Sequence, residues 1–222
     1  MVVDLIVLTL NEIDGLRKIM PCVKKEWVNR IIIIDGGSTD GTIEEAKKLG
    51  IKILFQKSKG FGGAIFDAFE SSDAEYLIMF GADGNNEPEE IPKLVKKIQE
   101  GYEQVIISRF GKTSINEDAG LIDGFGNKMF TFFANILFGG HFTDTLSSSR
   151  AFTRTAWNEL KFDAFGLDSV YQMSIRGLIK KHEIFEIDGN ERMRVGGKRK
   201  MNRIPTGINL SSRLLKELIW KG

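Results

Sequence analysis

Oxygen-bearing side chains follow three apolar runs of the sequence, at the points where buried strands are expected to end. The three sets are Asn11 and Glu12 after residues 4–10, Asp35 after 30–34, and Asp83 and Asn85 after 76–80. Carboxylate and amide oxygens bind hard cations such as Mg²⁺ or Mn²⁺, which also take phosphate oxygens as ligands. Asp83 stands among small residues, where a ligand can approach closely. This pattern predicts a site that holds a divalent cation and a diphosphate.

The first half of the chain alternates between strand and helix patterns. Continuous β-branched runs, such as the four isoleucines at 31–34, are typical of parallel strands buried on both faces. The expected strands are 4–10, 30–34, 51–55, 76–80 and 104–108, and helices are expected after Asn11 and at 42–49, 62–71 and 89–100. Right-handed crossovers bring the carboxyl ends of such strands to one edge of a sheet. We therefore expect an α/β fold with a mostly parallel central sheet, helices on both faces and the polar residues at one edge.

After Arg109 the regular alternation stops. The polar stretch 112–120 is expected to be a mobile loop, and the elements expected beyond it are helices at 122–138, 154–160, 169–181 and about 209–220, with short strands at 151–152 and 183–187. The sequence contains no internal repeat and no low-complexity linker. We therefore expect one domain over residues 1–222, in which residues 110–222 build on residues 1–109.

The composition is that of a globular protein. The chain has 222 residues, of which 42% are hydrophobic and 27% charged, and its net charge of +1 does not favour a nucleic-acid partner. Cys22 is the sole cysteine, which excludes an intrachain disulfide, and it is expected to be packed. No signal peptide pattern and no apolar run near ~20 residues is present, so we expect a cytoplasmic protein that can lie peripherally on a membrane. His182 is expected at the surface, and no zinc pattern is found.

Two glycine-rich loops allow more than one interpretation. After the second strand, Asp35 can accept a hydrogen bond from a nucleobase, while Thr39 or Asp40 caps the next helix. Asn11 is likewise expected to cap the helix that follows it. The run Lys-Gly-Phe-Gly-Gly-Ala at 59–64 is either a loose phosphate loop at a helix N-terminus or a tight turn with close helix packing.

Several motifs, taken in order along the chain, resemble family 2 glycosyltransferases of the GT-A fold. They are Leu-Asn-Glu at 10–12, Asp-Gly-Gly-Ser-Thr-Asp-Gly-Thr at 35–42, Lys-Gly-Phe-Gly-Gly-Ala at 59–64, Gly-Ala-Asp-Gly-Asn at 81–85, Ser-Arg at 108–109, Thr-Asp-Thr at 143–145, Arg-Ala-Phe at 150–152 and the basic run 194–200. Within that family the chain is most similar to dolichyl- or polyprenyl-phosphate mannosyl- and glucosyltransferases. The resemblance covers nearly the whole chain, which makes it more specific than any one motif.

The resemblance implies a role for each matching residue. The nucleotide sugar would be bound by Leu10, Asn11, Glu12, Asp35, Lys59, Gly62, Ala82, Asp83, Gly84, Arg194 and Lys200. Asp83 and Asn85 would hold Mg²⁺ or Mn²⁺. Asp83, Arg109 and Asp144 would be the catalytic residues, with Arg109 on a phosphate and Asp144 in the acceptor half. Residues 1–109 would then form the nucleotide-sugar-binding half and residues 110–222 the acceptor half.

The chain departs from the family pattern at three positions. Gly81 stands where the first carboxylate of an Asp-x-Asp motif is usual, which implies a weaker metal site or a larger share of the work for basic residues. Arg199 replaces the usual serine before Lys200, and Gly36 stands where a second aspartate is common.

The resemblance implies inverting transfer of a hexose, mannose or glucose, from GDP-mannose or UDP-glucose to a polyprenyl or dolichyl phosphate. A phosphate acceptor is already ionised near neutral pH, so no strong base is required. One alternative is transfer to a sugar hydroxyl in surface polysaccharide synthesis, with Asp144 or Asp168 as the base. Another is a catalytically weakened sugar-nucleotide-binding or regulatory subunit, which Gly81 suggests. A nucleotidyltransferase is a weaker alternative, because Asn11 and Glu12 replace the glycine- and basic-rich loop that such enzymes carry after the first strand.

The basic segment 192–203 contains six basic residues and no acidic one. We expect it to fold over bound phosphates, with contact to an anionic bilayer as a second use and a solvated charged surface as the simplest alternative. The amphipathic C-terminal helix is expected to pack on its own protein, to lie in a membrane interface or to join a membrane partner subunit.

Overall fold

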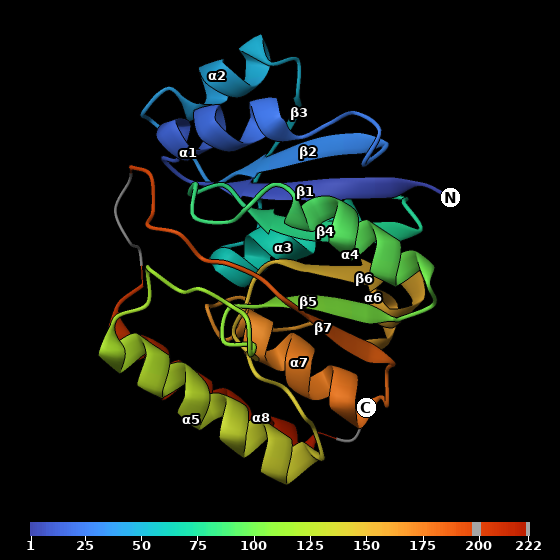
Figure 1. Ribbon diagram of the computed structural model, residues 1–222, viewed down its shortest axis with the longest axis vertical. Helices are drawn as coiled ribbons and strands as arrows, with labels where there is room; N and C mark the ends of the chain where they lie inside the picture. The colour runs from blue at the N-terminus through green and yellow to red at the C-terminus, as the bar shows by residue number, and fades with distance from the viewer. Residues whose placement is uncertain (197–200, 221–222) are drawn as a thin grey trace.

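A single mixed sheet organises the computed structural model, which describes residues 1–196 and 201–220 (Figure 1). Its strand order is β3-β2-β1-β4-β6-β5-β7. The strands are β1 Val3–Thr9, β2 Arg30–Asp35, β3 Lys52–Phe55, β4 Tyr76–Gly81, β5 Gln104–Ser108, β6 Arg150–Thr153 and β7 Ile184–Asp188. Only β6 among these is antiparallel to its neighbours, β4 and β5. The expectation of a mostly parallel sheet is confirmed.

Helices cover both faces of this sheet, as expected. They are α1 Ile13–Ile19, α2 Thr42–Lys48, α3 Phe61–Glu70, α4 Glu90–Gln99, α5 Leu121–Phe138, α6 Arg154–Glu159, α7 Ser169–Ile179 and α8 Arg203–Ile219, with a short 3₁₀ turn η1 at Met20–Cys22. In β1, Leu5 and Val7 face the core under α1 and α4, while Ile6 faces the core under α3, α6 and α7. This two-sided burial explains why β1 is apolar without alternation.

The second half adds a helical layer in which α5 and α8 pack against α7. A separate small core joins the three helices through Phe130, Ala134, Tyr171, Ile175 and Leu210. Helix α8 begins at Arg203, about two turns before the expected start near residue 209. The sequence pattern missed these turns because they contain Pro205 and Gly207, which are poor helix formers, although proline is tolerated in a first turn. Among the described residues no helix is both long and apolar enough to cross a bilayer.

The stretch 112–120 is a loop, as expected, and two of its backbone N–H groups are bound: that of Thr113 donates to Asp188 and that of Glu117 donates to the carbonyl of Glu191. Two other expectations need correction. Cys22 is exposed at the end of η1, because the chain leaves the helix there. His182 is buried rather than exposed.

A buried carboxylate fixes α8 on α7. Glu217 is 1% exposed and accepts hydrogen bonds from Arg176 at 2.8 Å, Gln172 at 2.9 Å and Arg213 at 3.2 Å. Arg176 is itself buried, so both charges of this ion pair lie inside the protein, away from water. Removing one partner of such a pair leaves an uncompensated charge inside the protein.

Replacing Glu217 by alanine should therefore lower the free energy of unfolding by about 3 kcal/mol, measured by urea denaturation. Lys216→Ala, at the exposed neighbouring position of the same helix, serves as the control and should change it by less than about 0.5 kcal/mol. Equal stabilities of the two variants would contradict the role given to Glu217.

Candidate active site

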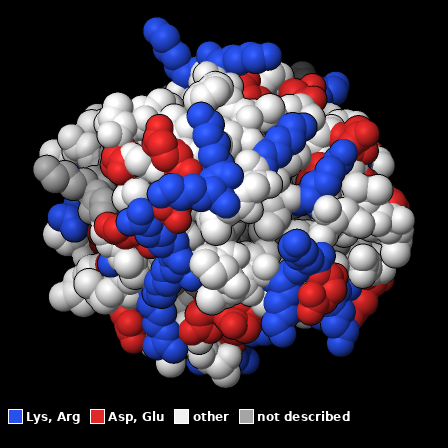
Figure 2. Space-filling model, turned by 90° about the horizontal axis from the view of Figure 1, so that it is seen from above, with Lys and Arg blue, Asp and Glu red and all other residues white. Residues whose placement is uncertain are grey.

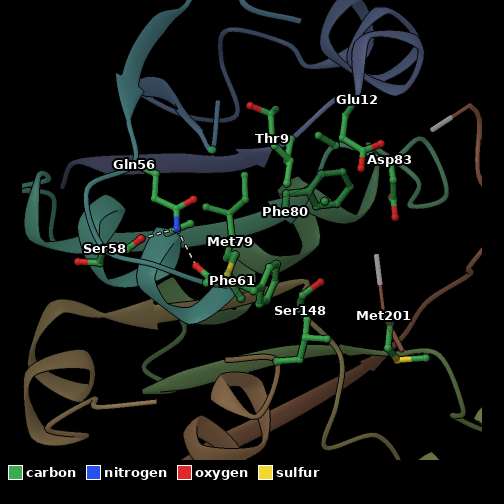
Figure 3. Close-up of a pocket in the computed structure, with 18 of the residues that line it drawn as sticks. Thr9, Glu12, Gln56, Ser58, Phe61, Met79, Phe80, Asp83, Ser148 and Met201 are labelled. Carbon is green, nitrogen blue, oxygen red and sulfur yellow. Dashed lines mark hydrogen bonds between the residues drawn. The ribbon is translucent and has the colours of Figure 1, made fainter. Parts of the chain in front are cut away.

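A cleft of about 710 Å³ lies at the carboxyl ends of β1, β2, β3 and β4, and we call it the strand-end cleft (Figure 3). Its lining includes Thr9, Leu10, Glu12, Gly36, Gln56–Phe61, Met79–Asp83, Ser148, Arg194 and Met201. In Figure 3 Glu12 and Asp83 lie together at one end, while Gln56 and Ser58 lie at the other. The gathering of polar residues from successive strand ends at one edge is thus confirmed.

Arg194 joins two strand ends across this cleft. Its guanidinium donates to both carboxylate oxygens of Glu12, at 3.1 and 3.2 Å, and to Oδ2 of Asp83 at 2.7 Å. The segment that carries Arg194 is held by its backbone, because the N–H of Val195 donates to the carbonyl of Asp83 at 3.0 Å. A cation from the second half of the chain therefore lies between two carboxylates of the first half.

The other carboxylate oxygen of Asp83, Oδ1, accepts no hydrogen bond from Arg194. Oδ1 is buried, and within residues 1–196 and 201–220 no hydrogen-bond partner reaches it. Burial raises the pKa of Asp83, the Arg194 charge opposes that rise, and the Glu12 charge adds to it. An unpaired buried carboxylate oxygen beside a cleft suits a divalent cation, so Asp83 fits the metal that the sequence pattern implied.

A second cleft, of about 540 Å³, opens between α5 and α8, and we call it the helix cleft. Its walls combine apolar side chains, Phe125 and Phe130 from α5 and Leu210 from α8, with the ion pair of Arg203 and Asp123 at 2.8 Å. Arg109 also lines this cleft. The two clefts share Gly81, Asp83, Ser148, Arg194 and Met201 as lining residues. A ligand in each cleft would therefore meet the other at Asp83 and Arg194.

Arg109 is fixed beside the helix cleft by Asp144. Its Nε donates to Oδ2 of Asp144 at 2.6 Å and its Nη2 donates to Oδ1 at 3.0 Å. Asn127 also donates to Asp144, at 2.7 Å. Burial alone would raise the pKa of Asp144, but the Arg109 charge and these hydrogen bonds outweigh it and leave the pKa below its ordinary value. Asp144 therefore holds Arg109 in place and is poorly suited to act as a base.

Other predicted site residues use their polar groups inside the protein. The carboxylate of Asp35 is 1% exposed and binds Thr9 Oγ1, Ser38 Oγ and the N–H groups of Gly37 and Ser38, so it is not among the lining residues of the strand-end cleft. Its contact with a nucleobase therefore stays a prediction. Asn85 is buried, and its amide donates to Glu191 at 3.2 Å.

The helix-capping expectation for Asn11 is wrong. Its Oδ1 accepts from the N–H of Thr39 instead, because a backbone φ of 55° turns the side chain toward the neighbouring loop. The N-cap of α2 is Gly41 rather than Thr39 or Asp40. Asp40, one residue before it, accepts from the N–H of Thr42, the first residue of α2, and from the N–H of Ile13 at the start of α1.

The segment 59–64, which enters α3, packs closely against residues 164–166. The N–H of Gly62 donates to the carbonyl of Phe165 at 3.0 Å, and a Cβ on Gly62 would collide with the carbonyl oxygen of Ala164. This favours the tight-turn interpretation over a phosphate loop. Lys59 is exposed and lines the strand-end cleft. Leu10, Ala82 and Asp83 line it as well, whereas Gly84 lies under Val195. Lys200 lies outside the described residues.

Sequence reasoning missed several lining residues. Gln56, Lys57 and Ser58 directly follow β3, so the strand-end rule that found Asp83 also applies to them. Ser148 and Met201 line both clefts but lie outside any motif. Ser148 reaches the site because β6 starts at this edge of the sheet, a position that depends on its antiparallel pairing.

Within the described part of the chain, one cluster offers three potential metal ligands, Glu103, Glu159 and His182. Glu103 precedes β5 and His182 precedes β7, so the cluster lies at the opposite edge of the sheet from both clefts. His182 lies 2.8 Å from the amide of Gln104 and 3.0 Å from Glu159, and these hydrogen bonds account for its burial.

Comparison with known proteins identifies similar sequences and a similar fold. The sequence model of Glycosyl transferase family 2 matches residues 4–161. Glycosyltransferase AglJ of Haloferax volcanii is 32% identical over 164 residues, which cover 72% of this chain and 54% of AglJ, so the chain spans about half of that relative. Dolichyl-phosphate hexose transferase of the same organism is 26% identical over 191 residues, covering 85% of this chain and 82% of the relative.

Glucosyl-3-phosphoglycerate synthase of Mycobacterium tuberculosis has a similar structure, solved with Mn²⁺, uridine diphosphate and phosphoglyceric acid. Its TM-score is 0.77 at 18% sequence identity, and the match covers 100% of this chain and 80% of that one. At this identity the likeness concerns the fold alone.

The segment that carries Arg194 is hydrogen-bonded to Glu90, a buried acid at the start of α4. Glu90 is 1% exposed and accepts from the N–H of Asn190 at 2.9 Å. Burial raises the pKa of Glu90 to about 7. The Glu90 carboxyl group therefore binds its proton more tightly in the folded protein than in the unfolded chain. This difference stabilises the folded protein at low pH, and the stabilisation is lost as pH rises through about 7.

Glu90→Gln should remove this pH dependence. Near pH 4 the variant and the parent should be about equally stable, whereas above about pH 8 the variant should be more stable by about 3 kcal/mol. Thermal or urea unfolding across that range measures the difference. Glu89→Gln, at the exposed neighbouring position, is the matched control, and parallel pH profiles for parent and Glu90→Gln would contradict the assignment.

Proposed function

The chain belongs to glycosyltransferase family 2, and from that premise we propose that it is an inverting enzyme that moves a hexose onto a polyprenyl or dolichyl phosphate. The donor is a nucleoside diphosphate sugar, GDP-mannose or UDP-glucose. The observation that carries the proposal is that two clefts, one at the strand ends and one between α5 and α8, meet at Asp83 and Arg194. The name of dolichyl-phosphate hexose transferase, which matches most of the chain, supports the same acceptor class.

The donor is assigned to the strand-end cleft, whose volume suits a nucleotide sugar. Its diphosphate would lie beside Asp83, whose unpaired Oδ1 would hold Mg²⁺ or Mn²⁺. When bound, the cation neutralises charge on the diphosphate leaving group. Arg194, placed between Glu12 and Asp83, contributes a second positive charge to the same phosphates.

The acceptor is assigned to the helix cleft. Arg109 would bind the acceptor phosphate, and the apolar side chains Phe125, Phe130 and Leu210 would receive the first part of the prenyl chain. A phosphate oxygen entering from the helix cleft approaches the sugar from the side opposite the leaving diphosphate, which inverts the anomeric carbon.

The proposal favours a phosphate acceptor over a sugar hydroxyl for a physical reason. A hydroxyl must lose a proton, and the two bases named from the sequence, Asp144 and Asp168, are poorly placed to take it. Asp144 is ionised and fully hydrogen-bonded, and Asp168 accepts from Arg213 at 2.8 Å without lining either cleft in the described residues. A phosphate acceptor needs no such base.

Asp83→Asn tests the proposed chemistry. Purified protein with Mn²⁺ or Mg²⁺, a short polyprenyl phosphate and GDP-mannose or UDP-glucose should give glycosyl lipid, and the variant should reduce the rate roughly 100-fold or more. Glu44→Gln, an exposed acid on α2, should leave the rate unchanged. Transfer to sugar acceptors alone would support the polysaccharide alternative. Donor binding without turnover would support a regulatory subunit. Absence of donor binding would contradict the proposal.

A lipid-linked acceptor requires contact with a bilayer, and the helical layer offers a suitable surface. We call it the apolar helix face, and it consists of the exposed apolar residues Leu121, Ile122, Phe125, Phe132, Phe133, Ile136 and Leu137 of α5 and Ile204, Ile208, Leu215, Leu218 and Ile219 of α8. Phe125 and Ile122 also line the helix cleft, so its mouth belongs to this face. By contrast, the face in Figure 2 shows Lys and Arg intermingled with Asp and Glu. We propose that the apolar helix face rests on the bilayer and that the protein is peripheral.

Replacing Phe132 and Ile136 together by serine should weaken binding to vesicles of anionic phospholipid at least about tenfold, measured by co-sedimentation. Neither residue lines the helix cleft, so turnover of a short, detergent-dispersed acceptor should be unaffected. Phe55→Ser, at an exposed phenylalanine on β3, is the control and should bind vesicles like the parent. Absence of vesicle binding by the parent would contradict the bilayer contact and favour a membrane partner subunit.

A further inference from the structure

Gly81 leaves a space at the end of β4 that two side-chain oxygens border. A Cβ added at Gly81 would lie 2.9 Å from Oδ1 of Asn86 and 3.4 Å from Oδ1 of Asp83. All three residues line the helix cleft. Gly81 stands where the family pattern has its first carboxylate. The amide oxygen of Asn86 therefore borders the space that this carboxylate would occupy.

The two neighbouring asparagines differ in what their amides do. Asn85 is buried and its amide donates to Glu191, which turns the side chain away from Gly81. Asn86 is half-buried, and in the described part of the chain its side chain has no hydrogen-bond partner. Asn86 is thus the asparagine with an amide oxygen available beside Asp83.

Two acceptor oxygens beside one small space, with no donor supplied between them, form an arrangement that a cation stabilises. Arg194 does not compete for the place, because it binds the other carboxylate oxygen of Asp83, Oδ2. Divalent ions such as Mg²⁺ are commonly held by one or two protein oxygens, with phosphate oxygens and water completing the shell. One carboxylate and one amide oxygen satisfy that requirement.

We propose that Mg²⁺ or Mn²⁺ is held by Oδ1 of Asp83 and Oδ1 of Asn86 in the space left by Gly81, so that Asn86 supplies the ligand that the missing carboxylate would have given. Asn85, which the motif spacing suggested, supports Glu191 instead. This inference rests on the proposed function, because it concerns the cation of that reaction.

The test is Mn²⁺ binding to the whole chain, followed by the electron paramagnetic resonance signal of free Mn²⁺, with and without UDP or GDP. Asn86→Ala should weaken binding on the order of tenfold or more, whereas Asn85→Ala should change it less than about twofold. Thermal unfolding of both variants establishes that each is folded. The opposite ranking of the two variants would overturn the proposal.

A rescue experiment separates ligand loss from a structural effect. Gly81 does not have a positive φ, and its close neighbour is the end of the Asn86 side chain, so a carboxylate fits there once Asn86 is shortened. Gly81→Asp combined with Asn86→Ala should restore Mn²⁺ affinity to that of the parent or above it. Failure to restore it in a folded double variant would count against the shared space.

The outcomes also separate this inference from the proposed function. Glycosyl transfer that persists with chelator, together with no Mn²⁺ binding by the parent, would overturn the cation site and leave the transferase standing. Mn²⁺ binding that depends on Asn86, without binding of any nucleotide sugar, would support the site and contradict the transferase.

Discussion

The ion pairs of Arg194 with Glu12 and Asp83 join parts of the chain that are far apart in sequence. Glu12 follows β1, Asp83 follows β4, and Arg194 arrives on the segment beyond β7. Two carboxylates drawn together at the edge of a buried sheet repel each other and lose hydration, so the site needs a cation there even when no ligand is bound. Arg194 meets that need, and in doing so it forms the shared wall of the two clefts.

The strand β6 sets the distance over which the proposed reaction takes place. It lies between β4 and β5, so the end of β5, which bears Arg109, is separated from the end of β4, which bears Asp83, by two strand spacings of about 4.8 Å each. Ser148, in the turn that enters β6, lies in that gap and lines both clefts. A sugar can therefore lie between a diphosphate near Asp83 and a phosphate near Arg109. The separation follows from one short antiparallel strand.

The sequence predicted the sheet and the edge at which the strand-end residues Glu12 and Asp83 lie. These predictions succeeded because hydrophobic periodicity and crossover handedness act through the backbone. Arg194 was expected near a phosphate from the family resemblance and the basic run, not from strand or helix periodicity. Predictions about single polar groups were less successful, since they depend on which partner reaches each group first. Asp35 is satisfied by its own loop and Asn85 by Glu191, a residue 106 positions away. No local pattern contains that information.

The Arg194 contacts also bear on which molecules the strand-end cleft can admit. A ligand that draws the guanidinium away removes the positive charge paired with Asp83, so a neutral nucleoside would have to separate this ion pair without replacing it. A nucleoside diphosphate that carries its own cation replaces both partners of the ion pair, because it offers anionic oxygens to Arg194 and a positive charge to Asp83. In the proposed reaction the ion pairs of the unliganded site would thus select ligands by charge, before any contact with the base or the sugar is made.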